Sequence, residues 1–400
     1  MARVFTGWSF SVINHPADSD VIEPNTKFFQ GSGLVRHEAQ WTHPMAIFPA
    51  YHDTGAKSLL GLTLPAGKSG EEDLAAVLDC LAAHPNTAPF ICRRLIQRLV
   101  TANPSPAYVY RAACAFTASG GNFPATFKAI LLDPEARDPA NALAAPGFGK
   151  KREPLVRHVA FLRAFDGKTQ LPLSDLVPFG YPPEELSKFP AGTTRMRYWH
   201  SDGRLGQSPQ SAPSVFNWFS PDYVPAGILA INNLTSPELK LMDENSYAGE
   251  DNLNYEGIFW KITTARLPGQ ELSLPDLPGA EYLGIDFEPL EACYLAMVDS
   301  NGDGSFTAED TETFNQPAEI TAACEAVIDR IDLLLCAGSL KARYGNTPDR
   351  PRRIIIDTVS SIQAEGNPVD DAAFQASCMH TRICNALWLV MSSADAAIQK

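Results

Sequence analysis

The sequence predicts a mainly α-helical fold, an irregular multi-helix domain with long loops rich in proline and glycine. Apolar residues recur at helical spacing in most segments that lie between proline and glycine clusters. The chain contains 32 prolines, so irregular backbone must form a large part of the structure. No internal repeat is visible in the sequence, which disfavours a solenoid.

Composition and charge limit the classes of protein to consider. The chain has 400 residues, of which 45% are hydrophobic, enough for a large core. Its formal net charge of −14 argues against nucleic acid or an anionic membrane surface as a partner. There is no apolar run of about 18 residues, so the sequence predicts no transmembrane helix.

We expect one large helical domain over residues 1–400, in four sections. Residues 1–68 are loop-rich with room for short strands, and 69–165 are helical. Residues 166–290 are loop-rich, with an aromatic cluster and a helix near 237–265. Residues 291–400 are helical again and contain an acidic loop at 299–310.

Helix boundaries follow from capping residues. Ser69 and Glu72 form a capping box at the start of the first helix. A second helix should run from about Ala88 to Thr101, and a third should begin at Ser105-Pro106 and stop at Gly120-Gly121. Further helices are predicted near Pro124–Leu132, Glu153–Phe165, Pro237 to the 260s, Pro317–Cys336, Pro351–Ala364 and Asp370–Met391.

The segment Asp299-Ser-Asn-Gly-Asp-Gly-Ser-Phe-Thr-Ala-Glu-Asp310 has the spacing of oxygen donors that a calcium ion requires. Ligands in such a loop come from positions one, three, five, seven, nine and twelve, with glycine at six. Those ligands are Asp299, Asn301, Asp303, the Ser305 carbonyl, Thr307 and Asp310, and Gly304 is at the turn. The sequence thus predicts a single EF-hand-like site for Ca²⁺. The alternative is a surface turn, which also favours Asp, Asn and Gly.

The last ligand departs from the usual pattern of such loops. Asp310 replaces the longer glutamate that normally supplies both carboxylate oxygens. In this the loop resembles those of dockerin modules, which also end in aspartate. One loop is visible rather than a pair, so the sequence favours a structural role for the ion.

The eight cysteines form either disulfides or buried free thiols. None of them forms a CxxC pair, so zinc-ribbon and thioredoxin sites are disfavoured. Cys378 and Cys384 are six residues apart in a predicted helix, so a bridge between these two is not expected. A disulfide from Cys324 or Cys336 to one of them, or buried free thiols throughout, both remain open.

Catalytic residues are unknown from the sequence. His52, Asp53 and Glu153 are the least implausible polar cluster for a hydrolase that acts on a glycan or an ester. His37, His43 and His52, with Asp53, are a candidate transition-metal set, although their spacing matches no zinc template. Asp53-Thr-Gly55 matches the aspartic-protease triplet, but that chemistry needs two such carboxylates, so a turn explains this segment better.

Two other segments bear on function. Gly206-Gln-Ser-Pro-Gln210 lacks the final glycine of a nucleophile elbow, so Ser208 is disfavoured as a nucleophile. The aromatic cluster Phe216, Trp218, Phe219 and Tyr223 either packs in the core or lines a groove for a carbohydrate or another polymer, with Asp222 or Asn217 as polar contacts.

Several long blocks resemble a known family. They are His84-Pro-Asn-Thr-Ala-Pro-Phe-Ile-Cys-Arg-Arg-Leu-Ile-Gln-Arg-Leu-Val100, Asn103-Pro-Ser-Pro-Ala-Tyr108, Arg152-Glu-Pro-Leu-Val-Arg157 and Gly206-Gln-Ser-Pro-Gln-Ser-Ala-Pro-Ser-Val-Phe-Asn-Trp-Phe-Ser-Pro-Asp-Tyr223. His52-Asp-Thr-Gly-Ala-Lys57 and Trp388-Leu-Val-Met-Ser-Ser393 add to them. The chain is identified as a member of the bacterial Domain of Unknown Function 1800 family, over nearly its whole length.

The resemblance implies a mainly α-helical fold and members that are often exported. Their genes often sit beside those of a sulfatase-like companion family. It implies no reaction and no catalytic residues. The segment like Val4-Phe-Thr-Gly-Trp8 lies well inside the family's domain, so we expect this chain to be a C-terminal portion, its export signal lost with the N-terminal part. The calcium loop is then an insertion.

Together these observations predict an exported, calcium-stabilised protein of the periplasm or the exterior. We expect it to act as a binding or scaffold component of the cell envelope, with a polymer ligand or a sulfatase-like protein partner. The alternative is a hydrolase that acts on a glycan or an ester. A third possibility is that this chain is half of a composite unit, which its N-terminal part or the sulfatase-like partner completes.

Overall fold

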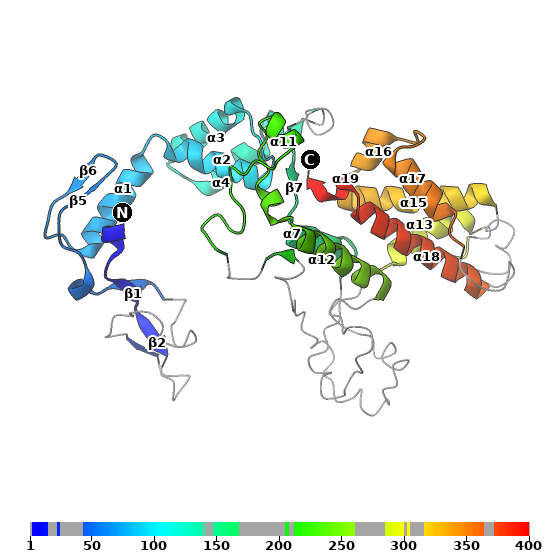
Figure 1. The fold of residues 1–400 in the computed structure, drawn as a ribbon, viewed down its shortest axis with the longest axis horizontal. Helices are drawn as coiled ribbons and strands as arrows, with labels where there is room; N and C mark the ends of the chain where they lie inside the picture. The colour runs from blue at the N-terminus through cyan, green and yellow to red at the C-terminus, as the bar shows by residue number, and fades with distance from the viewer. Residues whose placement is uncertain are drawn as a thin grey trace. The chain divides into compact units, whose positions relative to one another are not determined.

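The computed structural model describes residues 2–14, 22–24, 43–138, 140, 147–167, 205–207, 212–260, 285–299, 302–304, 316–363 and 372–399. Over these residues the chain is mainly α-helical, as predicted (Figure 1). It divides into two compact units. The first comprises Met1–Ile91 and Phe116–Gly121, and the second comprises Cys92–Ala115 and Asn122–Lys400. The predicted single domain stays a prediction.

Short antiparallel strands occur in the first unit, as expected for residues 1–68. β1 (Trp8–Phe10) pairs with β4 (Met45–Ile47), β2 (Val12–Asn14) with β3 (Ile22–Pro24), and β5 (Lys57–Leu59) with β6 (Leu62–Leu64). Leu60 and Gly61, with φ of 47° and 81°, join β5 to β6 in a two-residue turn. Positive φ at both central residues suits the right-handed twist of a hairpin.

Helix α1 (Gly70–Ala83) provides the core of the first unit. Its predicted capping box is confirmed, because Ser69 accepts from the Glu72 amide and Glu72 accepts from the Ser69 amide. α1 packs on β6 and on the 3-10 helix η1 (Ala2–Phe5), and it buries Val77. A second 3-10 helix, η2 (Pro49–Tyr51), precedes His52.

The next helices also lie where the sequence places them. They are α2 (Thr87–Leu99), α3 (Pro106–Ala118) and α4 (Phe123–Leu131). The short helix α5 (Pro134–Arg137) follows them and is not among the predicted helices. α3 stops before Gly120 and Gly121, whose φ values are 65° and 82°.

A layer of packed helices holds the largest core of the second unit. α15 (Pro317–Cys336) packs against α13 (Glu288–Val298), α17 (Pro351–Ser360) and α18 (Ala372–Met391) (Figure 1). Prolines in the first turns of α13, α15 and α17 fix where each helix begins. The apolar faces of these helices are fully buried, for example Leu290, Ile328, Ile356 and Leu387.

Shorter elements complete the second unit. These are β7 (Lys150–Lys151) paired with β8 (Ile398–Gln399), α7 (Pro154–Ala164), α11 (Ile228–Ile231), the 3-10 helix η4 (Pro237–Leu241), α12 (Glu244–Tyr255), the π-helical turn η5 (Glu256–Trp260), α16 (Ser339–Tyr344) and α19 (Ala394–Ala397).

Two predicted helices have different bounds in the structure. The helix expected from Pro237 into the 260s is interrupted, because Asp243 and Ser246 exchange side-chain-to-backbone hydrogen bonds of 2.7 and 2.9 Å and start α12 anew. The helix expected to reach Ala364 ends at Ser360, where the hydroxyls of Ser360 and Ser361 donate to carbonyls of the last turn.

Candidate functional site

The acidic loop begins where α13 ends. Asp299 follows α13 directly, and its carboxylate accepts from the Gly302 amide at 2.6 Å and from the Gly304 amide at 2.8 Å. Both glycines have positive φ, 76° and 75°, as the sharp turn predicted at Gly304 requires. α13 and α15, on either side of the loop in sequence, pack against one another.

Most predicted calcium ligands cannot be placed. Asn301, Ser305, Thr307 and Asp310 lie outside the described residues, while Asp299 and Asp303 lie within them. Over the described ranges, there is no group of three or more His, Cys, Asp or Glu side chains arranged to hold a metal ion. Calcium binding at residues 299–310 therefore stays a prediction.

His52 belongs to a buried polar network in the first unit. Its Nε2 lies 3.2 Å from Asp73 Oδ2, and its Nδ1 lies 2.9 Å from the Thr6 carbonyl. Lys57 Nζ lies 2.5 Å from the same Asp73 oxygen. The Asp73 side chain is fully buried, so this carboxylate holds two buried basic groups.

Asp53 takes part in a surface ion pair. Both of its carboxylate oxygens accept from Arg3, at 2.5 and 3.0 Å, and one also accepts from the Gly55 amide. The hydrogen bond from Arg3 holds the pKa of Asp53 well below its usual range. Asp53-Thr-Gly55 is thus a turn closed by its own aspartate, as expected.

The two other histidines of the transition-metal set leave that predicted site untested. His43 is exposed, and His37 lies outside the described residues.

Glu153 lies in the second unit, in a buried charged cluster of its own. Its carboxylate pairs with Arg98 on one oxygen and accepts from Gln207 Nε2 at 2.7 Å on the other. Lys150 Nζ donates to Glu238 at 3.1 Å and to the Arg98 carbonyl at 2.9 Å. Three of the sequence blocks that carry the family resemblance, around Arg98, Glu153 and Gln207, thus meet here. A single catalytic cluster of His52, Asp53 and Glu153 stays a prediction.

Lys151 differs from its neighbour Lys150. Its Nζ is buried and finds no hydrogen-bond partner among the described residues. Burial lowers the pKa of Lys151 to about 8, and Arg157 adds to the shift although Glu250 opposes it. Arg157 itself pairs with Glu250 at 2.9 Å. These pairs leave no local signal in the sequence, because Lys150 and Glu238 are 88 residues apart.

His158 on α7 gives the protein a predictable acid sensitivity. The residue is fully buried, and burial lowers its pKa to about 4 in the folded chain. The unfolded chain binds the proton near pH 6.5, so stability is lost as the pH falls from about 6.5 towards 4. Between pH 7 and pH 5 we expect this group to cost about 2 kcal/mol. Urea unfolding at pH 7 and at pH 5 measures this difference in the free energy of unfolding.

His158→Gln should shrink this pH difference, whereas His43→Gln, at an exposed residue, should leave it unchanged. An equal pH dependence in the His158→Gln variant and the wild type would show that another group is responsible.

The aromatic cluster makes contacts within the protein. The Arg98 guanidinium lies 5.4 Å from the centre of the Phe219 ring. Asp222, expected as a polar contact for a ligand, pairs with Arg94 at 3.3 Å. Phe216 and Val215 remain exposed, at 42% and 94%. A polymer-binding groove here stays a prediction, and Ser208 lies outside the described residues.

All eight cysteines are free thiols in the structure, and five of them are buried. Burial raises the pKa of Cys324 to about 11 and that of Cys336 to about 12. These thiols stay protonated at neutral pH, so they act as small apolar core residues.

Over the described residues, fold and contacts together define a mainly α-helical protein that buries several ion pairs. The family model "Protein of unknown function (DUF1800)" matches residues 1–391, and the chain belongs to this family. No curated protein and no solved structure matches the chain. Among the described helices, none is long and apolar enough to cross a membrane. That the chain is a C-terminal portion, and that its loop is dockerin-like, stay predictions.

Proposed function

We propose that this protein is a calcium-stabilised binding or scaffold component of the bacterial cell envelope. The observation that carries the proposal is the placement of Asp299. Two backbone amides fix its carboxylate at the end of α13, in the first position of a loop that leads to α15. A carboxylate at the first position of such a loop is the kind of oxygen ligand that calcium takes.

Electrostatics favour an ion in this loop. Asp299, Asp303, Glu309 and Asp310 place four negative charges within twelve residues, which repel one another in the empty loop. Calcium accepts six to eight oxygen ligands in flexible geometry, whereas magnesium demands a tighter octahedron. A bound calcium ion ties the end of α13 to the segment before α15.

The proposed location outside the cytoplasm rests on calcium supply. A loop that ends in the short Asp310 is expected to bind weakly, and weak sites fill where free calcium is high. A polymer or a sulfatase-like protein is the proposed partner.

Thermal unfolding tests the stabilising role. At a calcium concentration about 100 times its Kd, the ion should add about 2.7 kcal/mol of stability and raise Tm, relative to the protein in a chelator. Asp299→Ala should abolish the calcium-dependent rise. Glu309→Gln is the matched control, because it removes a charge from the loop at a position that supplies no ligand.

A Tm that is the same with calcium and with chelator would refute the proposal. A loss of the rise in Glu309→Gln as large as in Asp299→Ala would show that net charge rather than coordination is responsible.

A further inference from the structure

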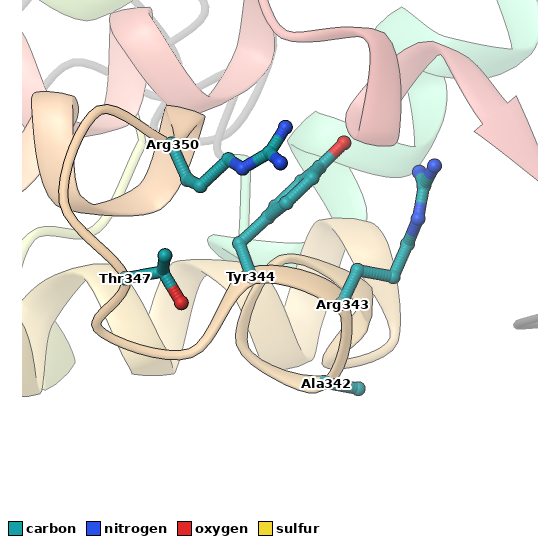
Figure 2. Close-up of a pocket in the computed structure, with 5 residues that line it drawn as sticks. All are labelled: Ala342, Arg343, Tyr344, Thr347 and Arg350. Carbon is teal, nitrogen blue, oxygen red and sulfur yellow. The ribbon is translucent and has the colours of Figure 1, made fainter.

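A pocket of about 530 Å³ lies between α16 and the start of α17. It is lined by Ala342, Arg343, Tyr344, Thr347 and Arg350 (Figure 2). The volume lies within the range of about 300–1,000 Å³ typical of small-molecule sites. Both guanidinium groups and the Thr347 hydroxyl are polar donors, so the lining suits an acid.

The loop that forms one side of the pocket is held rigidly from beneath. Arg352, which is only 1% exposed, donates to the Gly345 carbonyl at 3.1 Å and to Asn346. The same guanidinium pairs with Glu325 at 2.8 Å and Asp329 at 2.5 Å, both on α15. The loop conformation is therefore fixed before any ligand arrives, which lowers the entropy cost of binding.

The backbone at both ends of this loop is unusual. Gly345 has φ 52° and ψ −137°, and Asp349 has φ 59°. Glycine adopts positive φ without strain, whereas Asp349 carries a backbone cost of the kind found at ligand sites, where the surrounding structure holds it. Asp349 places Arg350 at the edge of the pocket.

The opposite side of the pocket is anchored by Asp395 of α19, whose side chain is 4% exposed. Arg343 donates to Asp395 at 2.6 Å, and its guanidinium lies 5.1 Å from the centre of the Tyr344 ring. Figure 2 shows the guanidinium groups of Arg343 and Arg350 on either side of this ring. Asp395 neutralises Arg343, so the charges of the two arginines are not equivalent.

Arg350 is the uncompensated cation of the pocket. Within the described ranges its guanidinium has no ion-pair or hydrogen-bond partner. It belongs to a basic segment, residues 341–353, with five basic residues and one acidic residue in a chain of net charge −14. Four of the five, Lys341, Arg343, Arg352 and Arg353, pair with acidic residues outside the segment, so Arg350 supplies the positive charge that remains for an anion.

We propose that this pocket binds a singly charged acid of about monosaccharide size, a carboxylate or a sulfate ester. The Arg350 guanidinium takes two acid oxygens in a forked hydrogen bond, and Thr347 donates from the loop. One uncompensated guanidinium matches one negative charge, which disfavours a doubly charged phosphate monoester. The remaining volume receives the body of the ligand against Tyr344.

Calorimetric titration at fixed ionic strength and pH 8 tests this with four sugars that share a ring. The probes are glucuronate, glucose 6-sulfate, glucose 6-phosphate and neutral glucose. We expect binding of glucuronate or of glucose 6-sulfate, and the tighter of these two arms identifies the acid. Arg350→Gln should weaken it at least tenfold, as expected for the loss of a charged hydrogen bond.

Arg353→Gln is the matched control, because Arg353 is a nearby arginine on α17 that pairs with Asp357 and lies outside the pocket lining. It should bind as the wild type does. Unchanged circular dichroism of Arg350→Gln confirms its fold. The proposal is overturned if neither acid binds, if glucose or glucose 6-phosphate binds as tightly, or if Arg350→Gln and the wild type bind alike.

Discussion

Asp73→Ala is expected to destabilise the protein by about 3–5 kcal/mol, because it leaves two buried basic groups without a counter-charge. The Asp73 side chain is fully buried, and the side chains of Lys57 and His52 are nearly so, with exposed fractions of 6% and 2%. Urea unfolding followed by circular dichroism measures the loss.

The partner substitutions separate charge from packing. Replacing both members of the pair, Lys57→Met with Asp73→Leu, should lower the free energy of unfolding less than Asp73→Ala alone. The double variant removes the lysine together with its carboxylate, so only His52 loses a partner. If the single and double variants are equally unstable, the loss arises from packing rather than from the ion pair.

The Asp73 carboxylate also makes the stability of the fold depend on pH in acid. Burial is the largest influence and raises the pKa of Asp73, but hydrogen bonds and charges from Lys57 and His52 outweigh it and lower the pKa overall. The stability that Asp73 contributes is therefore present above about pH 3.9, where the unfolded carboxyl titrates, and is lost as the pH falls towards the folded pKa.

Arg352→Met is the second substitution with a large expected effect. It keeps the aliphatic volume but removes a buried guanidinium that holds Glu325, Asp329 and the Gly345 carbonyl together. Both acidic partners are more than a fifth exposed and regain water, so we expect the lower end of the usual range, about 3 kcal/mol. Chemical denaturation gives the free energy of unfolding.

Arg353→Met is the matched control for this loss. Arg353 forms an exposed pair with Asp357 one turn along α17, and such pairs contribute about 0.3–0.5 kcal/mol. A loss of less than about 1 kcal/mol in Arg352→Met would show that Arg352 does not hold the loop and α15 together.

Local signals in the sequence were enough for most helices. Ser69 with Glu72, Pro106, Gly120 and the proline that opens α15 each act within a few residues, so they can be recognised without tertiary structure. The break at Asp243 was missed, because aspartate followed three residues later by serine is a weaker form of the capping box.

The long-range networks could not be predicted in this way. Asp73 binds Lys57 and His52, 16 and 21 residues away, and Lys150 binds Glu238, 88 residues away. Tertiary packing brings such partners together, so their spacing in the sequence does not reveal them. The chemistry of His52 and Glu153 marks them as candidates in the sequence, and the structure adds the buried hydrogen bonds that each of them makes. The basic segment at 341–353 does not reveal in the sequence which arginine stays available for an anion, because the acidic partners of Lys341, Arg343 and Arg352 lie 12 to 52 residues away.

Calcium titration by calorimetry tests the central claim most directly. The wild-type protein should release or absorb heat that saturates at one ion per chain, and Asp299→Ala should give the heat of dilution alone while Glu309→Gln still binds. Equal heats from the wild type and Asp299→Ala would contradict a calcium site at residues 299–310.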